Sequence, residues 1–245
     1  MHSIKAFFTS LGMYTRLPIK PKSFKETSSQ SLLLNLVIVG GLIGVLWWLF
    51  YDFMIGFNIS KVVLSAIVML FPYWITGYLH LDGYMDVSAL ILSRRGGYTN
   101  NERHNAFGMI ALAVLFVINY ASIYHFIDIK DTSILLIFIP IISRELTVLM
   151  IFLFPALSGS DYEVYKNSKK SEFTVILMIL FVITIVFCIT LAGIRGSILI
   201  VAMLCSFLFS IISAKENCGM SGDTAGYALT ISEVIGLLAL AIFKF

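Results

Sequence analysis

The chain alternates between long apolar runs and short polar segments. A helix needs roughly 20 mostly apolar residues to cross a bilayer, and most of these runs come close to that length. The pattern therefore predicts about seven transmembrane helices, at about residues 32–50, 61–79, 107–126, 133–154, 173–192, 196–213 and 226–243. The fifth and sixth are separated only by a short turn near Gly193 and Gly196, so one long, broken hairpin is an alternative interpretation.

The composition agrees with this pattern. Of the 245 residues, 59% are hydrophobic and 13% are charged, whereas a soluble domain is usually about 45–50% apolar and about 25% charged. We therefore expect an all-α, polytopic integral membrane protein with a single domain over residues 1–245. Residues 1–31 are expected to form a cytoplasmic or interfacial N-terminal segment, and residues 80–106 and 214–226 to form active-site loops.

Basic residues are distributed unevenly over the predicted loops. If the N-terminus is cytoplasmic, twelve of the 17 lie inside, four lie outside and Arg144 lies within a span. The positive-inside rule therefore predicts a cytoplasmic N-terminus and, with seven spans, an external C-terminus in the cell membrane. The net charge of +3 is too small to indicate a nucleic-acid partner.

The same topology places four polar segments on the cytoplasmic side. They are TRLP (residues 15–18), HLDGYMD (80–86), DYEVYKNSKK (161–170) and GMSGDTAG (219–226). The segments that connect the spans on the other side are short and contain few polar residues of interest. This one-sided distribution is typical of a membrane enzyme whose active site faces cytosolic substrates.

The segment HLDGYMD indicates a metal site. Asp82 and Asp86 are four residues apart, so a helix would place both carboxylates on one face. Two like charges there repel each other unless a cation lies between them, and hard oxygen ligands suit Mg²⁺. The alternative is a solvated helix end with two unrelated acids. His80 is an acid–base candidate, although an interfacial histidine is the commoner case.

The segment GMSGDTAG places three glycines and an aspartate directly before an apolar helix. Backbone N–H groups at such a helix start can bind a phosphate, and Asp223 could hold the metal that neutralises it. A lone glycine-rich turn often serves only as a connection. On the same side as Asp82 and Asp86, however, it is a plausible second half of a metal–phosphate site.

Three ionisable residues lie within the apolar runs, where an unpaired charge is costly. They are Arg144, Glu145 and Glu233. Pairing of Arg144 with one of the two acids as a structural contact is one interpretation, and contact with an anionic substrate is the other. The loop arginines Arg16, Arg94, Arg95 and Arg103 are suited to neutralising phosphate, or to holding a basic loop at anionic lipid.

Four segments together resemble one known family of membrane enzymes. They are TRLP, HLDGYMD with the following SRR, the SR pair in a central apolar run, and SGDTAGYALTISE near the C-terminus. In order and spacing they are similar to the cobalamin synthase family, the adenosylcobinamide-GDP ribazoletransferases, over most of the chain. The combination of HLDG with SGD–G is quite specific to that family.

The resemblance implies a transferase of the last steps of cobalamin (vitamin B12) biosynthesis that requires Mg²⁺. Adenosylcobinamide-GDP and α-ribazole, or its 5′-phosphate, would give adenosylcobalamin, or its 5′-phosphate, plus GMP. The partners would be these substrates and the lipid bilayer, with a homo-oligomer left open. Together with the residues discussed above, the resemblance gives the catalytic candidates Asp82, Asp86, His80 and Glu233. The expected metal ligands are Asp82, Asp86 and Asp223. The expected substrate contacts are Arg16, Arg94, Arg95, Arg103, Arg144, Ser221, Gly222 and Thr224.

The chain departs from the family pattern near HLDGYMD. Ala89 stands where the family usually has a third aspartate, and RRGGYTNNERHNAFG is several residues shorter than the family segment, with Glu102 as its only acid. The loss of a metal ligand or general base would lower the rate by about 10² or more. A catalytically weakened family member is therefore one alternative.

Two other functions also compete. A CDP-alcohol phosphotransferase combines membrane helices with aspartate-rich motifs, but its D-x-x-D-G-x-x-A-R run is absent from this sequence. A transporter could use Arg144, Glu145 and Glu233 as a substrate or proton path. It would be expected to show interrupted spans in two related halves, which the sequence does not display.

Overall fold

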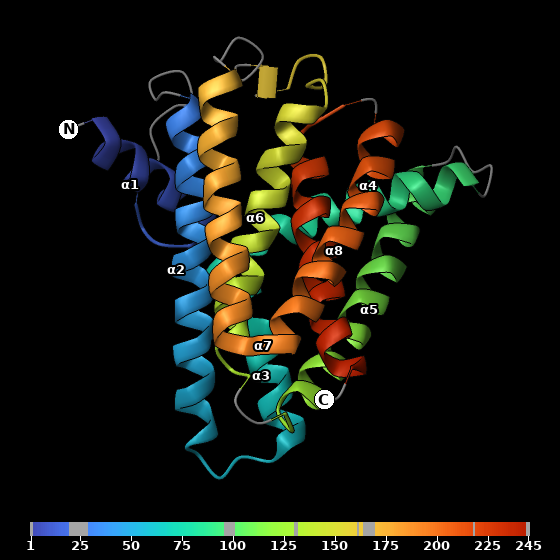
Figure 1. Ribbon diagram of the computed structural model, residues 1–245. Helices are drawn as coiled ribbons and strands as arrows, with labels where there is room; N and C mark the ends of the chain where they lie inside the picture. The colour runs from blue at the N-terminus through green and yellow to red at the C-terminus, as the bar shows by residue number, and fades with distance from the viewer. Residues whose placement is uncertain are drawn as a thin grey trace.

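The computed structural model describes residues 2–19, 29–95, 101–129, 132–160, 162–163, 170–217 and 219–243. Within these residues the chain forms helices and no strand apart from an isolated bridge between Ala156 and Met220. In chain order the helices are α1 (His2–Tyr14), α2 (Ser29–Ile55), α3 (Lys61–Ile75), α4 (Leu79–Arg95), α5 (Asn101–Phe126), α6 (Leu135–Leu153), α7 (Lys170–Glu216) and α8 (Gly222–Ile242). Most of them stand side by side as an upright bundle (Figure 1), which confirms the predicted fold class.

Five of the described helices are long and apolar enough to cross a membrane, and the bent pair α3 and α4 adds a sixth span if it counts as one. The longest, α7, is two helices joined at Gly193, whose φ of 57° lies in the left-handed region that favours glycine. Beyond Gly193 the chain doubles back. The two arms meet so closely there that a Cβ on Gly196 would lie 2.4 Å from the backbone oxygen of Cys188. The second arm returns beside α8 (Figure 1). The described residues thus hold five to six candidate spans where about seven were predicted, because the predicted spans 173–192 and 196–213 belong to this one broken helix.

The predicted span 61–79 is not one straight helix. It ends at Ile75, and α4 begins at Leu79 at an angle of 94° to α3. Gly77 and Tyr78 form the bend with φ values of 67° and 62°, and Tyr78 is the one non-glycine residue with positive φ in the described chain. As a result α4 runs across the upright helices (Figure 1).

The expectation that residues 80–106 form a loop is wrong for most of that range. Its described part is helical, because α4 continues to Arg95 and α5 begins at Asn101. The second expected loop, 214–226, is also shorter than predicted, since α7 ends at Glu216 and α8 begins at Gly222. Both motifs are therefore carried mainly by helices.

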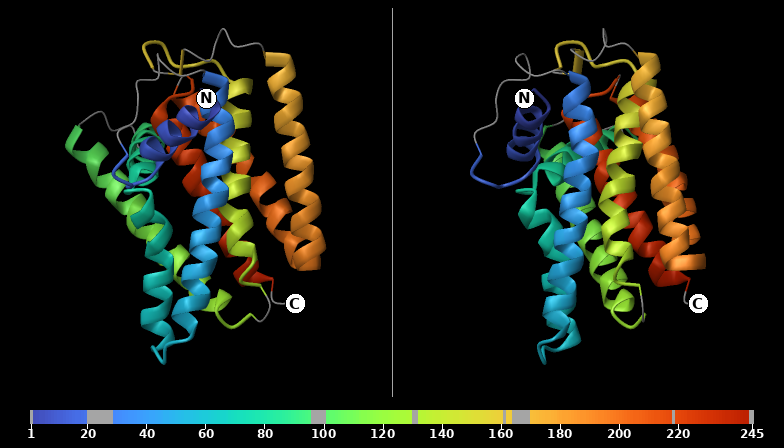
Figure 2. Two further views of the ribbon diagram at one scale, coloured as in Figure 1. Left: turned by 90° about the vertical axis from the view of Figure 1, so that its left-hand side faces the viewer. Right: turned by 60° about the vertical axis from the view of Figure 1, so that its left-hand side comes forward.

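The polar motifs gather at one end of the bundle. Figure 2 shows α1, the segment after α6 and the start of α8 at this end, away from the C-terminus. The segments before α8 and after α6 are joined by backbone hydrogen bonds from Leu157 to Met220 (2.9 Å) and from Met220 to Pro155 (2.8 Å). Most of DYEVYKNSKK lies outside the described residues. For the other three motifs, the predicted clustering at one end is confirmed.

The core lies between the upright helices. Its largest cluster includes Trp47, Phe126, Ile139, Met203 and Leu237 from α2, α5, α6, α7 and α8. The indole N–H of the first of these, Trp47, donates to the backbone oxygen of Val68 on α3, over 2.9 Å. The outer face of α7 instead exposes large apolar side chains that are suited to contact with lipid.

Candidate active site at the crossing of α4 and α8

The first turns of α4 and α8 cross at two glycines. A Cβ on Gly83 would lie 2.7 Å from the backbone Cα and oxygen of Asp223, and one on Gly226 would lie 3.0 Å from the backbone oxygen of His80. The hydroxyl of Thr230 donates to the same oxygen over 3.2 Å. Small residues allow helix backbones to approach this closely. The crossing therefore holds HLDGYMD against GMSGDTAG, two motifs that are far apart in the sequence.

Three carboxylates lie around this crossing. Asp82 and Asp86 are exposed and one helical turn apart on α4, and Asp223 is exposed in the first turn of α8. The charges of Asp82 and Asp86 both act on the carboxyl group of Asp223. In the part of the chain that the structure describes, no three or more His, Cys, Asp or Glu side chains form a ready metal-binding group. The arrangement is open, which suits an ion that takes few protein ligands and shares substrate phosphates.

The start of α8 is held by a network of polar side chains. Ser221 is the N-cap residue, and its hydroxyl accepts from the backbone N–H of Thr224 over 3.2 Å. The amide of Asn217 donates to the hydroxyls of Ser221 (3.1 Å) and Thr224 (2.8 Å), and the Thr224 hydroxyl donates to the backbone oxygen of Gly219 (3.2 Å). Ser221 and Thr224 are buried, whereas Gly222 is exposed. Of these three predicted substrate contacts, Gly222 is the most accessible.

A cavity of about 170 Å³ lies beside the crossing. Its lining includes His80, Asp82 and Asp223, together with Tyr14, Thr147 and Tyr162. His80 is buried, and its Nε2 has no hydrogen-bond partner among the described residues. Desolvation raises the pKa of the Tyr14 phenol to about 12, further above neutral pH than the ordinary value for tyrosine, and the hydroxyl is therefore a donor. The cavity thus combines two of the aspartates with neutral polar groups.

Sequence reasoning did not identify Tyr14, Thr147 and Tyr162 as part of the site. Two signals were available, because Tyr14 directly precedes TRLP and Thr147 is a polar residue three positions beyond Arg144 in an apolar span. Tyr162 follows α6 in a segment whose path depends on its hydrogen bonds to the region before α8. Nothing in its local sequence marks it as a cavity residue.

The predicted arginines fall into two groups. Arg16 is exposed, its backbone N–H donates to the oxygen of Ile75 over 2.8 Å, and its Cβ lies near Gly77. TRLP is thereby attached to the bend from which α4 begins. Arg94 and Arg95 belong to the last turn of α4 and Arg103 to the first turn of α5, but their side chains lie outside the described part of the structure.

The buried ion pair joins Arg144 on α6 to Glu233 on α8. The same Glu233 oxygen accepts from Ser143 over 3.0 Å, and the Arg144 guanidinium also donates to Ser143 (2.8 Å) and to the backbone oxygen of Pro140 (3.2 Å). One of the two predicted pairings, Arg144 with Glu233, is therefore confirmed. A direct contact between Arg144 and substrate stays a prediction.

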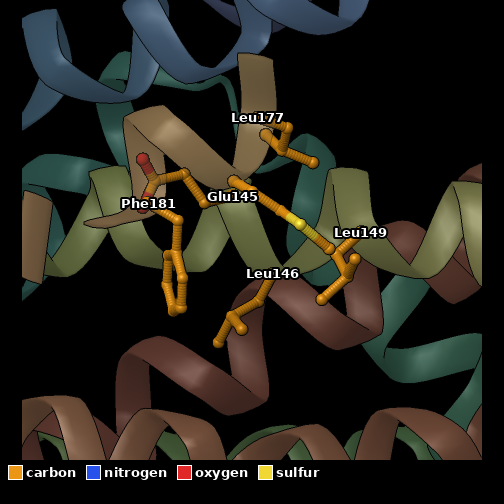
Figure 3. A pocket seen from close by; sticks show the side chains of 6 residues that line it. Glu145, Leu146, Leu149, Leu177 and Phe181 are labelled. Carbon is orange, nitrogen blue, oxygen red and sulfur yellow. The ribbon is translucent and has the colours of Figure 1, made fainter. Parts of the chain in front are cut away.

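Glu145 faces a different region of the bundle. It is buried, accepts from the hydroxyl of Thr184 on α7 over 2.8 Å, and has a second oxygen without a partner in the described chain. It lines a separate cavity of about 140 Å³ with apolar side chains from α6 and α7 (Figure 3). Arg144 and Glu145 are adjacent on α6 but contact different helices. Glu145 does not belong to the α4–α8 site.

Ala89 lies on the α5 side of α4. It is buried, and its Cβ is 3.5 Å from the position that a Cβ on Gly108 of α5 would occupy. Asp86 and Asp82, three and seven residues before Ala89 on the same side of the helix, are exposed. In this chain, position 89 therefore contributes to the packing of α4 on α5.

Comparison with known proteins gives a consistent result over the whole chain. Residues 6–241 match the family described as cobalamin-5-phosphate synthase. A protein of Clostridium botulinum (strain Alaska E43 / Type E3), named adenosylcobinamide-GDP ribazoletransferase, is 30% identical and the match covers 98% of both chains. A protein of the same name from Clostridium perfringens (strain SM101 / Type A) is 31% identical, with 97% of this chain and 98% of the relative covered. No solved structure matches.

Proposed function

This chain belongs to the cobalamin-5-phosphate synthase family, and we propose that it acts as an adenosylcobinamide-GDP ribazoletransferase. It joins adenosylcobinamide-GDP to α-ribazole, or to the 5′-phosphate of α-ribazole, and releases GMP. The products are adenosylcobalamin or its 5′-phosphate. The crossing of α4 and α8 is the observation that supports this most strongly, because it brings carboxylates from two distant motifs to one cavity.

The reaction exchanges one phosphorus–oxygen bond for another. A ribose oxygen of α-ribazole bonds to the phosphorus attached to cobinamide, and the bond from that phosphorus to the bridging oxygen of the diphosphate breaks. GMP leaves with the bridging oxygen, and the attacking hydroxyl loses its proton. Because a 5′-phosphate can persist into the product, the attacking hydroxyl is not the 5′ one. Catalysis then depends mainly on positioning and on neutralising phosphoryl charge.

Asp82, Asp86 and Asp223 are the residues that would hold Mg²⁺. They fit this ion because they are accessible oxygen donors, their like charges lie close enough to interact, and they leave room for substrate phosphates. When bound, the ion supplies positive charge to the phosphoryl oxygens. The dependence on Mg²⁺ and this ligand set are both part of the proposal.

The remaining site residues act on the substrates directly. Arg16 lies at the bend before α4, where it can neutralise phosphate charge, and Arg94, Arg95 and Arg103 are assigned the same role from the sequence. The exposed Gly222 begins α8, whose N-terminal backbone favours an anion. His80 is assigned to accept the hydroxyl proton, because it lines the cavity beside the aspartates.

The membrane orientation follows from the nature of the substrates. Adenosylcobinamide-GDP carries a diphosphate, and α-ribazole is a polar nucleoside that is also used as its 5′-phosphate. Both substrates therefore reach the site from water rather than through lipid. We assign this end of the bundle to the cytoplasmic face of the cell membrane, in agreement with the uneven distribution of basic residues.

The test is product formation by purified protein in lipid vesicles. Adenosylcobinamide-GDP, α-ribazole 5′-phosphate and Mg²⁺ are supplied, and GMP and the corrinoid product are both quantified. We expect equal amounts of the two products, and a loss of about 10²- to 10³-fold in the Asp82→Asn variant because a charged group at the phosphoryl centre is removed. Asp52→Asn is the matched control, since Asp52 is exposed near the C-terminal end of α2, away from the candidate site.

Each outcome has a clear meaning. Full activity of Asp82→Asn would exclude the proposed metal site, whereas activity that is unchanged when Mg²⁺ is withheld would exclude the ion. Corrinoid binding without GMP release would identify a catalytically weakened family member. The whole-chain comparison does not favour a CDP-alcohol phosphotransferase or a transporter, and neither of these would form the cobamide.

A further inference from the structure

The cavity beside the α4–α8 crossing is lined by two kinds of wall. One side carries Asp82 and Asp223, which the proposed reaction uses at the diphosphate. Another part consists of apolar side chains from three helices: Leu36 on α2, Leu79 on α4, and Ala225 and Leu229 on α8. A pocket that combines an apolar wall with a few placed polar groups is typical of a small-molecule site, in which the polar groups fix the orientation of the ligand.

The size of the cavity limits which part of the substrates it can hold. Its volume is about 170 Å³, and an apolar protein cavity of about 150 Å³ is large enough to bind benzene. A small fused aromatic ring system is therefore close to the limit. The corrin macrocycle is several times larger and must lie outside the cavity.

The chemistry of the walls distinguishes between the two bases in the reaction. Guanine has donors and acceptors around most of its edge, and those that face Leu36, Leu79 and Leu229 would be buried without partners, which is costly. The dimethylbenzimidazole base of α-ribazole has an apolar edge with two methyl groups and one free ring nitrogen. The Tyr14 hydroxyl, which stays protonated at neutral pH, is a suitable donor for an acceptor nitrogen.

We propose that this cavity is the binding site for the aromatic base of α-ribazole, and that its apolar wall selects among bases by size. This inference rests on the proposed function and makes it more specific. The base lies against Ala225 and Leu229 of α8, while the ribose extends toward the aspartates. The corrinoid and the guanosine of the other substrate then approach from outside the cavity.

Two substitutions in the wall should change base preference in opposite directions. Ala225→Val fills part of the cavity, and Leu229→Ala enlarges it. The readout is kcat/KM for ribosides of benzimidazole, dimethylbenzimidazole and the larger naphthimidazole. We expect Ala225→Val to lower the use of dimethylbenzimidazole relative to benzimidazole by about tenfold or more, since one methylene in a pocket changes discrimination by roughly 10- to 200-fold. Leu229→Ala should raise the relative use of naphthimidazole to a similar extent.

Matched control variants come from the same helix. Ala241→Val and Leu237→Ala make the same exchanges at buried positions of α8 that do not line the cavity. They should leave the ratios between bases unchanged even if they alter stability. Equal base ratios in wall and control variants would overturn the proposal. So would a wall variant that changes the choice between guanosine and inosine in the corrinoid substrate, since the cavity would then hold guanine.

A binding measurement separates this inference from the proposed reaction. Equilibrium binding of the three ribosides to the protein in vesicles is measured without the corrinoid substrate, so it requires no turnover. If the normal chain forms no GMP but the wall variants still shift riboside affinity in the expected directions, the reaction fails and the base site stands. If GMP is formed and neither kcat/KM nor affinity depends on the wall, the base site fails and the reaction stands.

Discussion

At the scale of single residues, the pair formed by Arg144 and Glu233 should contribute strongly to stability. Both side chains are buried, so Arg144→Met leaves a carboxylate without its partner. We expect this variant to lose about 3–5 kcal/mol of unfolding free energy. The double variant with Glu233→Gln should recover much of that loss, because no unpaired charge remains. Reversible unfolding in detergent micelles gives the coupling energy, and additive effects of the two changes would show that the pair is not a unit.

Residue types in the sequence indicated much of this chemistry. Asp82, Asp86 and Asp223 could be predicted to lie at the same end of the bundle because topology placed both motifs on one side, and Arg144 required a partner because a lone charge in an apolar span is costly. The choice of Glu233 over the adjacent Glu145 could not be predicted. It depends on the rotation of α6, which turns Arg144 toward α8 and Glu145 toward Thr184 on α7. That rotation is a property of the packed bundle.

At the scale of helices, the α4–α8 crossing should tolerate no added side-chain atom. Gly83→Ala places a Cβ 2.7 Å from backbone atoms of Asp223, so the helices must move apart. A displacement of about 1 Å at a reacting centre can cost about 10²-fold in rate, and we expect a loss of that order. Gly41→Ala on α2 is the matched control, since its Cβ would meet Ile141 at an ordinary 3.8 Å. Turnover in vesicles measures both, and equal activity of the two variants would show that the close crossing is not required.

The helical elements themselves could be predicted better than their ends. Apolar runs identified all the upright helices, including the two arms of α7, because lipid requires long segments with internally satisfied backbones. The break between α3 and α4 was missed because it lies only a few residues before the end of the predicted span, where the apolar run gives way to the polar motif. The glycine at position 77 was a weak signal, and the left-handed conformation of Tyr78 has no signature in the local sequence.

At the scale of the whole molecule, the uneven charge distribution implies a defined orientation in the membrane. The segment after α6 lies at the end with the candidate site, and the connection between α2 and α3 lies at the other end (Figure 1). Ser158 is exposed in the first of these segments and Asn58 in the second. In a variant without native cysteines, Ser158→Cys should react with a membrane-impermeant maleimide only after cells are permeabilised, whereas Asn58→Cys should react in intact cells. The expectation has two independent grounds, the positive-inside rule and the cytosolic location of phosphate-bearing substrates. The reverse labelling pattern would place the carboxylates of α4 and α8 outside the cell, where the proposed reaction has no supply of its nucleotide substrate.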